Sequence, residues 1–234
     1  MARKSPDREA RERAVSQIRQ FPDPVLRQTA RPVEEFDDDL RQLAARMVRI
    51  MDDAHGAGLA APQIGILKRL FVYQADADDD PRALVNPEIV ERSDETAVGG
   101  EGCLSLQVLL REEHDVPVER ARRIRVRALD VDGDEVELEA EGHEARVIQH
   151  ELDHLDGVLL LDHLDDDQAK AAKKFVREMQ MKRAEESGPA EGLDVGDQRV
   201  ELSRVVGDPR DRACAGRTTP CRRRGWTNRD RAGN

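Results

Sequence analysis

The pentapeptide His150-Glu151-Leu152-Asp153-His154 constrains this chain more than any other stretch, because its chemistry requires a helix with a buried face. Side chains four residues apart lie on the same face of an α-helix, so His150 and His154 can hold one metal ion together. Apolar side chains cluster on another side of the helix at about 100° per residue. We therefore expect residues 144–156 to form a core helix aimed into a cavity; two histidines hydrogen-bonded inside a core are the alternative.

The same spacing indicates a chemistry. A divalent ion held by neutral imidazoles lowers the pKa of bound water from about 15.7 to about 7. Glu151, beside the first imidazole, could take the proton of that water and return it to a leaving group. A catalytic site of this kind has three protein ligands, so the third must lie elsewhere in the chain.

Three classes of third ligand follow from the residues. A metzincin would carry a third histidine at the position of Leu160, so that class is disfavoured. A thermolysin-like endopeptidase would use a glutamate on a later helix, and Glu178 has a suitable place in the sequence. Cys103 is the other candidate, because it ends the glycine-rich stretch 99–103, where the backbone can approach a metal closely.

Composition and charge limit the function classes. The 234 residues are 38% hydrophobic and 37% charged with a net charge of −11, which predicts one domain with an aliphatic core and a highly charged surface. An acidic body argues against nonspecific nucleic-acid binding, and no run approaches the roughly 20 apolar residues of a membrane span. Three cysteines form no disulfide framework and favour a reducing compartment. We expect a cytoplasmic protein without DNA or membrane partners.

Residue periodicity predicts an α+β organisation. Hydrophobic spacings of three and four residues indicate helices, whereas alternation and short apolar runs indicate strands. The expected helices cover residues 37–54, 144–156 and 165–184, and the expected strands cover 70–73, 83–90, 108–118, 124–129 and 136–140. The last two strands should form a hairpin across the Asp132-Gly133 turn.

The two ends of the chain differ from its middle. We expect residues 1–16 to form a loose charged N-terminal arm, residues 17–186 to form one catalytic domain, and residues 187–234 to form a disordered tail. Residues 204–234 carry nine arginines against three aspartates, a charge of +6 that leaves −17 on residues 1–203. The basic tail is therefore the part of the chain that could contact RNA.

Three motifs together resemble those of the bacterial peptide deformylases. They are Gly56-Ala57-Gly58-Leu59-Ala60-Ala61-Pro62-Gln63, Glu101-Gly102-Cys103-Leu104-Ser105 and Gln149-His150-Glu151-Leu152-Asp153-His154, in the order of that family. The resemblance covers roughly residues 17–183. It implies a single α+β domain whose mixed, mostly antiparallel β-sheets wrap around a central metal-binding helix with the HExxH motif.

The resemblance also implies a site, residue by residue. Its metal ligands are Cys103, His150 and His154, its catalytic groups are Glu151, Gln63 and Leu104, and its substrate-binding backbone lies at Ala57, Gly58 and Gly102. Glu151 would be the general base and acid, while the Gln63 amide and the Leu104 backbone N–H would donate to a developing oxyanion. The implied ion is Fe(II), one per chain, with zinc, nickel or cobalt also accepted by such ligands.

The implied reaction is hydrolysis of the N-formyl group of the initiator N-formylmethionine, with release of formate. The implied partners are N-formylmethionyl nascent peptides, with transient ribosome association. After Ser105 the family often continues with a proline-glycine turn, whereas this chain departs from that pattern over residues 106–115. Two competing hypotheses are the endopeptidase that uses Glu178 and a noncatalytic metal-stabilised binding protein; the presence of Glu151 and Gln63 argues against the second.

Overall fold

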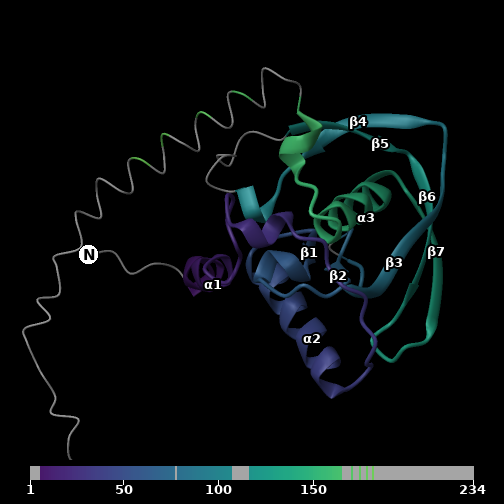
Figure 1. The fold of residues 1–234 in the computed structure, drawn as a ribbon, viewed down its shortest axis with the longest axis horizontal. Coiled ribbons are helices and arrows are strands. Elements are labelled where there is room, and N and C mark those ends of the chain that lie inside the picture. The colour runs from purple at the N-terminus through teal and green to yellow at the C-terminus, as the bar shows by residue number, and fades with distance from the viewer. Residues whose placement is uncertain are drawn as a thin grey trace, which may run out of the picture. The chain divides into compact units, whose positions relative to one another are not determined.

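Two antiparallel sheets surround one helix in the computed structural model, which describes residues 6–76, 78–106, 116–164, 170, 174, 178 and 181 (Figure 1). The first sheet has the order β1-β2-β3-β6-β7, formed by Gly58–Ala60, Leu70–Tyr73, Arg82–Arg92, Arg123–Leu129 and Glu135–Glu141. The second sheet pairs β4 (Thr96–Glu101) with β5 (Val116–Ala121). Every ladder between these strands is antiparallel, and Arg31 and Lys68 add one isolated parallel bridge. The expected α+β class is confirmed.

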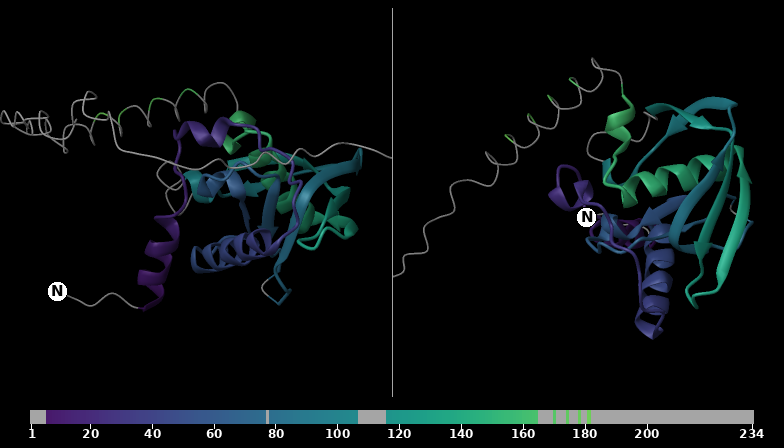
Figure 2. Two further views of the ribbon diagram at one scale, coloured as in Figure 1. Left: turned by 60° about the horizontal axis from the view of Figure 1, so that its bottom comes forward. Right: turned by 45° about the vertical axis from the view of Figure 1, so that its right-hand side comes forward.

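The strands next to the site are buried on both faces. Leu59 and Val72 pack into one apolar cluster with α2 (Asp38–Asp53), whereas Ala60, Phe71 and Tyr73 pack into another with α3 (Gly142–Leu155). Successive side chains of a strand point to opposite faces, so this part of the sheet lies between the two helices. Figures 1 and 2 show α2 and α3 on opposite sides of β1 and β2.

Both helices and the hairpin form where the sequence predicts them, for local reasons. Asp37 caps α2 by accepting a 2.9 Å hydrogen bond from the backbone N–H of Leu40. Gly142, with φ of +62°, lets the chain turn directly from β7 into α3. Gly133, with φ of +90°, lies in the turn between β6 and β7. The β6–β7 hairpin thus leads directly into α3, the helix that carries His150 and His154.

Other predictions differ from the structure or lie outside its described residues. Residues 6–15 of the expected loose N-terminal arm form the helix α1 (Pro6–Val15), and its Ala14 is buried in the same cluster as α2. Alanine, arginine and glutamate favour helices, and a few apolar side chains suffice to dock this one. Of the strand expected at 108–118, the described part begins at Val116. The tail from 187 onward, and most of the helix expected at 165–184, lie outside the described residues.

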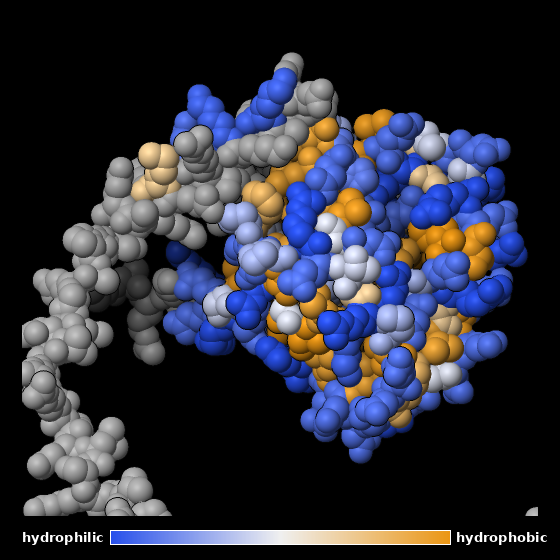
Figure 3. Space-filling view, viewed as in Figure 1, coloured by the Kyte–Doolittle hydropathy of each residue, from blue (hydrophilic) through white to orange (hydrophobic). Residues whose placement is uncertain are grey.

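The surface has the expected charged character. On the face shown in Figure 3, hydrophilic residues prevail and apolar residues appear in patches between them. Among the described helices, none is long and apolar enough to cross a membrane.

Candidate active site

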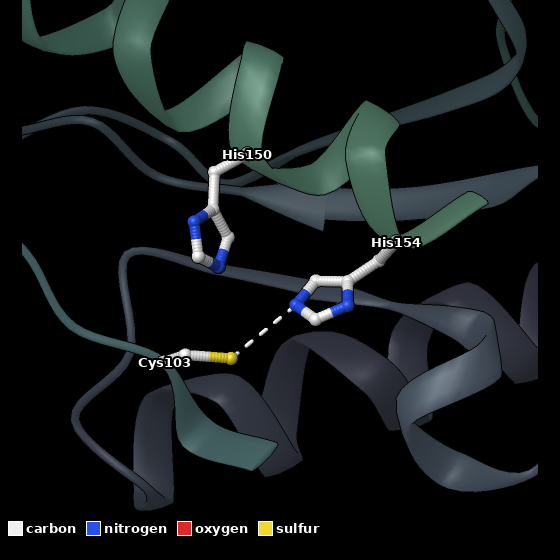
Figure 4. A group of neighbouring side chains, drawn as sticks. All are labelled: Cys103, His150 and His154. Atoms are coloured by element: carbon white, nitrogen blue, oxygen red, sulfur yellow. Dashed lines mark hydrogen bonds between the residues drawn. The ribbon is translucent and has the colours of Figure 1, made fainter. Parts of the chain in front are cut away.

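Two separate parts of the fold bring the three expected metal ligands together. His150 and His154 lie on successive turns of α3, and their rings are 5.0 Å apart between centroids. Cys103 follows the end of β4, just before the short 3₁₀ turn η3 (Leu104–Leu106). The Sγ of Cys103 lies 3.3 Å from Nε2 of His154, and one ligand atom from each residue falls within 4.8 Å of the others (Figure 4). The three side chains therefore meet at one place in the fold.

The closest pair in this cluster, Sγ of Cys103 and Nε2 of His154 at 3.3 Å, has the separation expected of two ligands of one transition-metal ion. An ion bound at about 2.0–2.3 Å by tetrahedral nitrogen and sulfur ligands places those ligands roughly 3.3–3.6 Å apart. Burial, reinforced by the nearby His150, lowers the pKa of His154 well below its ordinary value. His154 is therefore held in the neutral form that binds metals, and the set of one thiol and two imidazoles suits zinc, iron, nickel or cobalt.

Glu101 orients His150 from behind. Its Oε2 lies 2.9 Å from Nδ1 of His150, which leaves Nε2 of that ring for the metal. Arg120 grips the same carboxylate through two hydrogen bonds of 2.9 and 3.0 Å, and Arg146 adds a third of 2.8 Å. Burial alone would raise the pKa of Glu101, but the hydrogen bonds from His150 and Arg120 outweigh it and hold that pKa far below its usual range. The carboxylate stays ionised.

Glu151 is a buried carboxylate with an unusual pKa. Only 3% of the residue is exposed, and its Oε2 has no hydrogen-bond partner among the described residues. Burial raises its pKa to about 7, against the opposing effect of the nearby His150. A group with such a pKa can accept and release a proton near neutral pH, as a general base and acid must.

Gln63 and Leu104 lie on the two turns that flank Cys103. The Oε1 of Gln63 accepts a 2.7 Å hydrogen bond from the backbone N–H of Ala60, which fixes the orientation of the amide. The Nε2 group consequently points the other way, 3.2 Å from Oγ of Ser105 and 3.9 Å from Sγ of Cys103. The amide donor thus points toward Cys103, and η3 begins at the residue that follows Cys103.

The expected substrate-binding residues lie along strand edges near the cluster. β1 is the edge strand of the five-stranded sheet, so one side of it can accept an added strand. The carbonyl of Ala57 already accepts a 2.9 Å hydrogen bond from the N–H of Gln74. Because hydrogen-bonding directions alternate along an antiparallel strand, the backbone of Gly58 points to the open side. Gly102, between β4 and Cys103, is exposed.

Comparison with known proteins agrees with this arrangement. Residues 15–170 match the family model described as polypeptide deformylase. The chain belongs to this family. A peptide deformylase of Thermotoga neapolitana is 47% identical over 159 residues, which cover 68% of this chain and 90% of the relative. As a deformylase, the chain is a hydrolase that removes formyl groups from peptides.

Solved deformylase structures share the fold. The crystal structure of peptide deformylase from Thermotoga maritima has a TM-score of 0.59 and 47% identity, covering 63% of this chain and 96% of that one. A peptide deformylase structure from Legionella pneumophila has a TM-score of 0.63 and 38% identity, covering 71% of this chain and 95% of that one. The endopeptidase hypothesis fails in turn, because Glu178 has a side chain that is 62% exposed and pairs with Lys174 at 3.9 Å.

Sequence reasoning missed the residues that support the deformylase ligands. Glu101 was visible as the first residue of the second motif, yet nothing in the sequence alone assigned it to His150. The role of Arg120 and Arg146 could not be predicted from the sequence. Arginine is common throughout this chain, and the carboxylate that both residues bind, that of Glu101, lies on a different element of the fold.

Proposed function

We propose that this deformylase hydrolyses the N-formyl group of the initiator N-formylmethionine of nascent proteins, with Cys103, His150 and His154 holding one metal ion. The observation that carries the proposal is the convergence of this Cys-His-His cluster with a buried carboxylate, Glu151, and a fixed amide donor, Gln63. Amide hydrolysis needs activated water, a group that carries a proton, and a hydrogen-bond donor to the oxyanion. The metal site, Glu151 and Gln63 would supply these three functions in turn.

The residues divide the reaction between them. The ion, when bound, supplies Lewis acidity that acidifies water and polarises the formyl carbonyl. Glu151 takes a proton as the water oxygen bonds to the formyl carbon, and returns it to the amine nitrogen as the C–N bond breaks. Nε2 of Gln63 and the backbone N–H of Leu104 donate to the carbonyl oxygen while it carries negative charge. Formate and a free methionyl N terminus result.

The ion that we propose is Fe(II), one per chain. The resemblance to the family motifs supports iron, while the donor set also accepts zinc, nickel or cobalt. The backbone of Gly58 and Gly102, with the adjacent Ala57, would bind the peptide as an added strand. Such pairing uses main-chain groups and therefore tolerates many sequences after the first residue.

The test of this function is anaerobic assay of the iron-loaded protein on formyl-Met-Ala-Ser and on its acetylated analogue. We expect formate from the formyl peptide and little hydrolysis of the acetyl peptide, and absence of formate would refute the proposal. Cys103→Ala should lose the bound metal measured by elemental analysis, whereas Cys214→Ala, which changes the same residue type in the tail, should retain it. Full metal content in Cys103→Ala would show that the ligand set is wrong.

We also propose transient ribosome association through the basic residues 204–234. Nascent peptides emerge from the ribosome, and ribosomal RNA is anionic and attracts basic side chains. Cosedimentation with ribosomes should decrease as salt increases, and it should be weaker for a chain that ends after Ser187. Equal cosedimentation of both chains would exclude the tail as the contact.

A further inference from the structure

Residues 19–21 run along both turns that carry the proposed oxyanion donors. The backbone N–H of Arg19 donates to the carbonyl of Gln63 at 2.6 Å, and that of Phe21 donates to the carbonyl of Ser105 at 2.9 Å. Between them, Nε2 of Gln20 donates to the carbonyl of Leu104 at 2.8 Å. Three consecutive residues near the N terminus thus hold the Gln63 turn and the Leu104 turn in one arrangement.

Gln20 is the residue of this segment whose contribution depends on its side chain. The backbone bonds of Arg19 and Phe21 could be made by any residue except proline. The Leu104 carbonyl requires a donor, so the amide must present Nε2 to it. The other amide atom, Oε1, is buried and has no hydrogen-bond partner among the described residues. The contact with Leu104 is therefore what fixes this side chain.

The turn that receives this bond depends on outside contacts for its orientation. η3 is three residues long, and its own closing bond joins the N–H of Leu106 to the carbonyl of Cys103 at 3.0 Å. So short a 3₁₀ turn has little internal stability. Its direction is set where neighbouring segments bind it, and Gln20 binds the residue whose N–H is the proposed donor.

We propose that Gln20 is a positioning residue for deformylation, which aims the Leu104 N–H at the oxygen of the substrate by holding the Leu104 carbonyl. This inference rests on the proposed function. A misdirected donor stabilises the transition state less well but changes substrate binding little, because the oxygen becomes fully charged only in the transition state. We therefore expect kcat to fall while KM stays nearly constant. Loss of an oxyanion donor outright costs about 10²–10³-fold in kcat, and we expect about tenfold for its misplacement.

The experiment compares Gln20→Met, which keeps the length of the side chain but not its donor, with the wild type and with Gln17→Met. Gln17 is a matched control three residues earlier, whose amide contacts the Arg13 carbonyl and Arg46. Kinetics on formyl-Met-Ala-Ser, metal content, melting temperature and hydrogen exchange of peptides spanning residues 103–106 are measured. We expect lower kcat and faster exchange in Gln20→Met alone, with metal content and melting temperature unchanged.

The outcomes separate the two proposals. A wild type that releases no formate would overturn the proposed function and this inference with it. An active wild type with equal kcat and equal exchange in Gln20→Met would overturn the inference alone. A joint loss of kcat, metal and melting temperature would also overturn it, because it would show a structural role rather than a positioning one.

Discussion

Glu151 and Gly58 lie so close that the identity of one residue determines whether the other fits. A Cβ atom built on Gly58 would lie 2.3 Å from Oε1 of Glu151, far closer than the 3.0 Å that Cβ contacts in proteins respect. The glycine therefore leaves room for the carboxylate of Glu151. The resemblance implied a different role for this residue, in which its backbone pairs with the substrate peptide.

Substitution Gly58→Ala should destabilise the protein by about 1–3 kcal/mol, because the new methyl group must displace a buried carboxylate. Glu151→Ala removes the carboxylate, so Gly58→Ala should cost almost nothing in that background. Urea unfolding of the wild type, both single variants and the double variant measures this coupling. An equal cost of Gly58→Ala in both backgrounds would show that the collision with Glu151 is not its cause.

At the scale of elements, one arginine connects α3 to the β4–β5 hairpin. Arg146 donates to the carboxylate of Glu101 at 2.8 Å, to the carbonyl of Val118 at 2.8 Å and to that of Ala97 at 2.7 Å. A Cβ on Gly99 would lie 3.0 Å from Cζ of Arg146, so the glycine lets the guanidinium lie close to the strand. This contact holds β4, whose last residue orients His150 and whose continuation carries Cys103.

The substitution Arg146→Met should therefore lower the metal affinity by about tenfold. This is at the low end of the effect of residues that support metal ligands, because Arg120 still holds the carboxylate of Glu101. Competition with a chromogenic chelator measures the affinity. Arg122→Met is the matched control: Arg122 directly follows β5 and pairs with Glu95 and Glu141 at the surface. Unchanged affinity in Arg146→Met, or an equal loss in Arg122→Met, would contradict this role.

The elements also show how far the sequence predicts this fold. α2, α3 and the β6–β7 hairpin could be predicted, because a capping aspartate, helical periodicity and an Asp-Gly turn are local signals. His150, His154 and Glu151 could be proposed from their spacing, whereas Cys103 could be proposed only from its place in a family motif. The support from Arg120 and Arg146 could not, since it depends on side chains from different elements meeting in three dimensions. The same holds for Gln20, which lies 84 residues from its partner.

At the scale of the whole molecule, the catalytic parts occupy a limited stretch of the chain. All nine proposed site residues lie between Ala57 and His154, and the family match ends at residue 170. The relative from Thermotoga maritima is covered over 96% of its length by 63% of this chain. The family match thus ends before this chain's basic residues 204–234, whose charge of +6 contrasts with −17 on residues 1–203.

A chain that ends after Ser187 should therefore deformylate a free tripeptide as the full chain does. The expected kcat/KM on formyl-Met-Ala-Ser lies within about twofold of the wild type, because no proposed catalytic or substrate-binding residue is removed. The variant Glu151→Gln in the full chain gives the kcat/KM expected when the chain is intact but the proposed base is missing. A tripeptide probes the active site without the ribosome, so any effect of the basic residues on ribosome association stays separate. A loss approaching that of Glu151→Gln would show that residues 188–234 stabilise the catalytic domain, and the domain boundary would then have to be placed beyond Ser187.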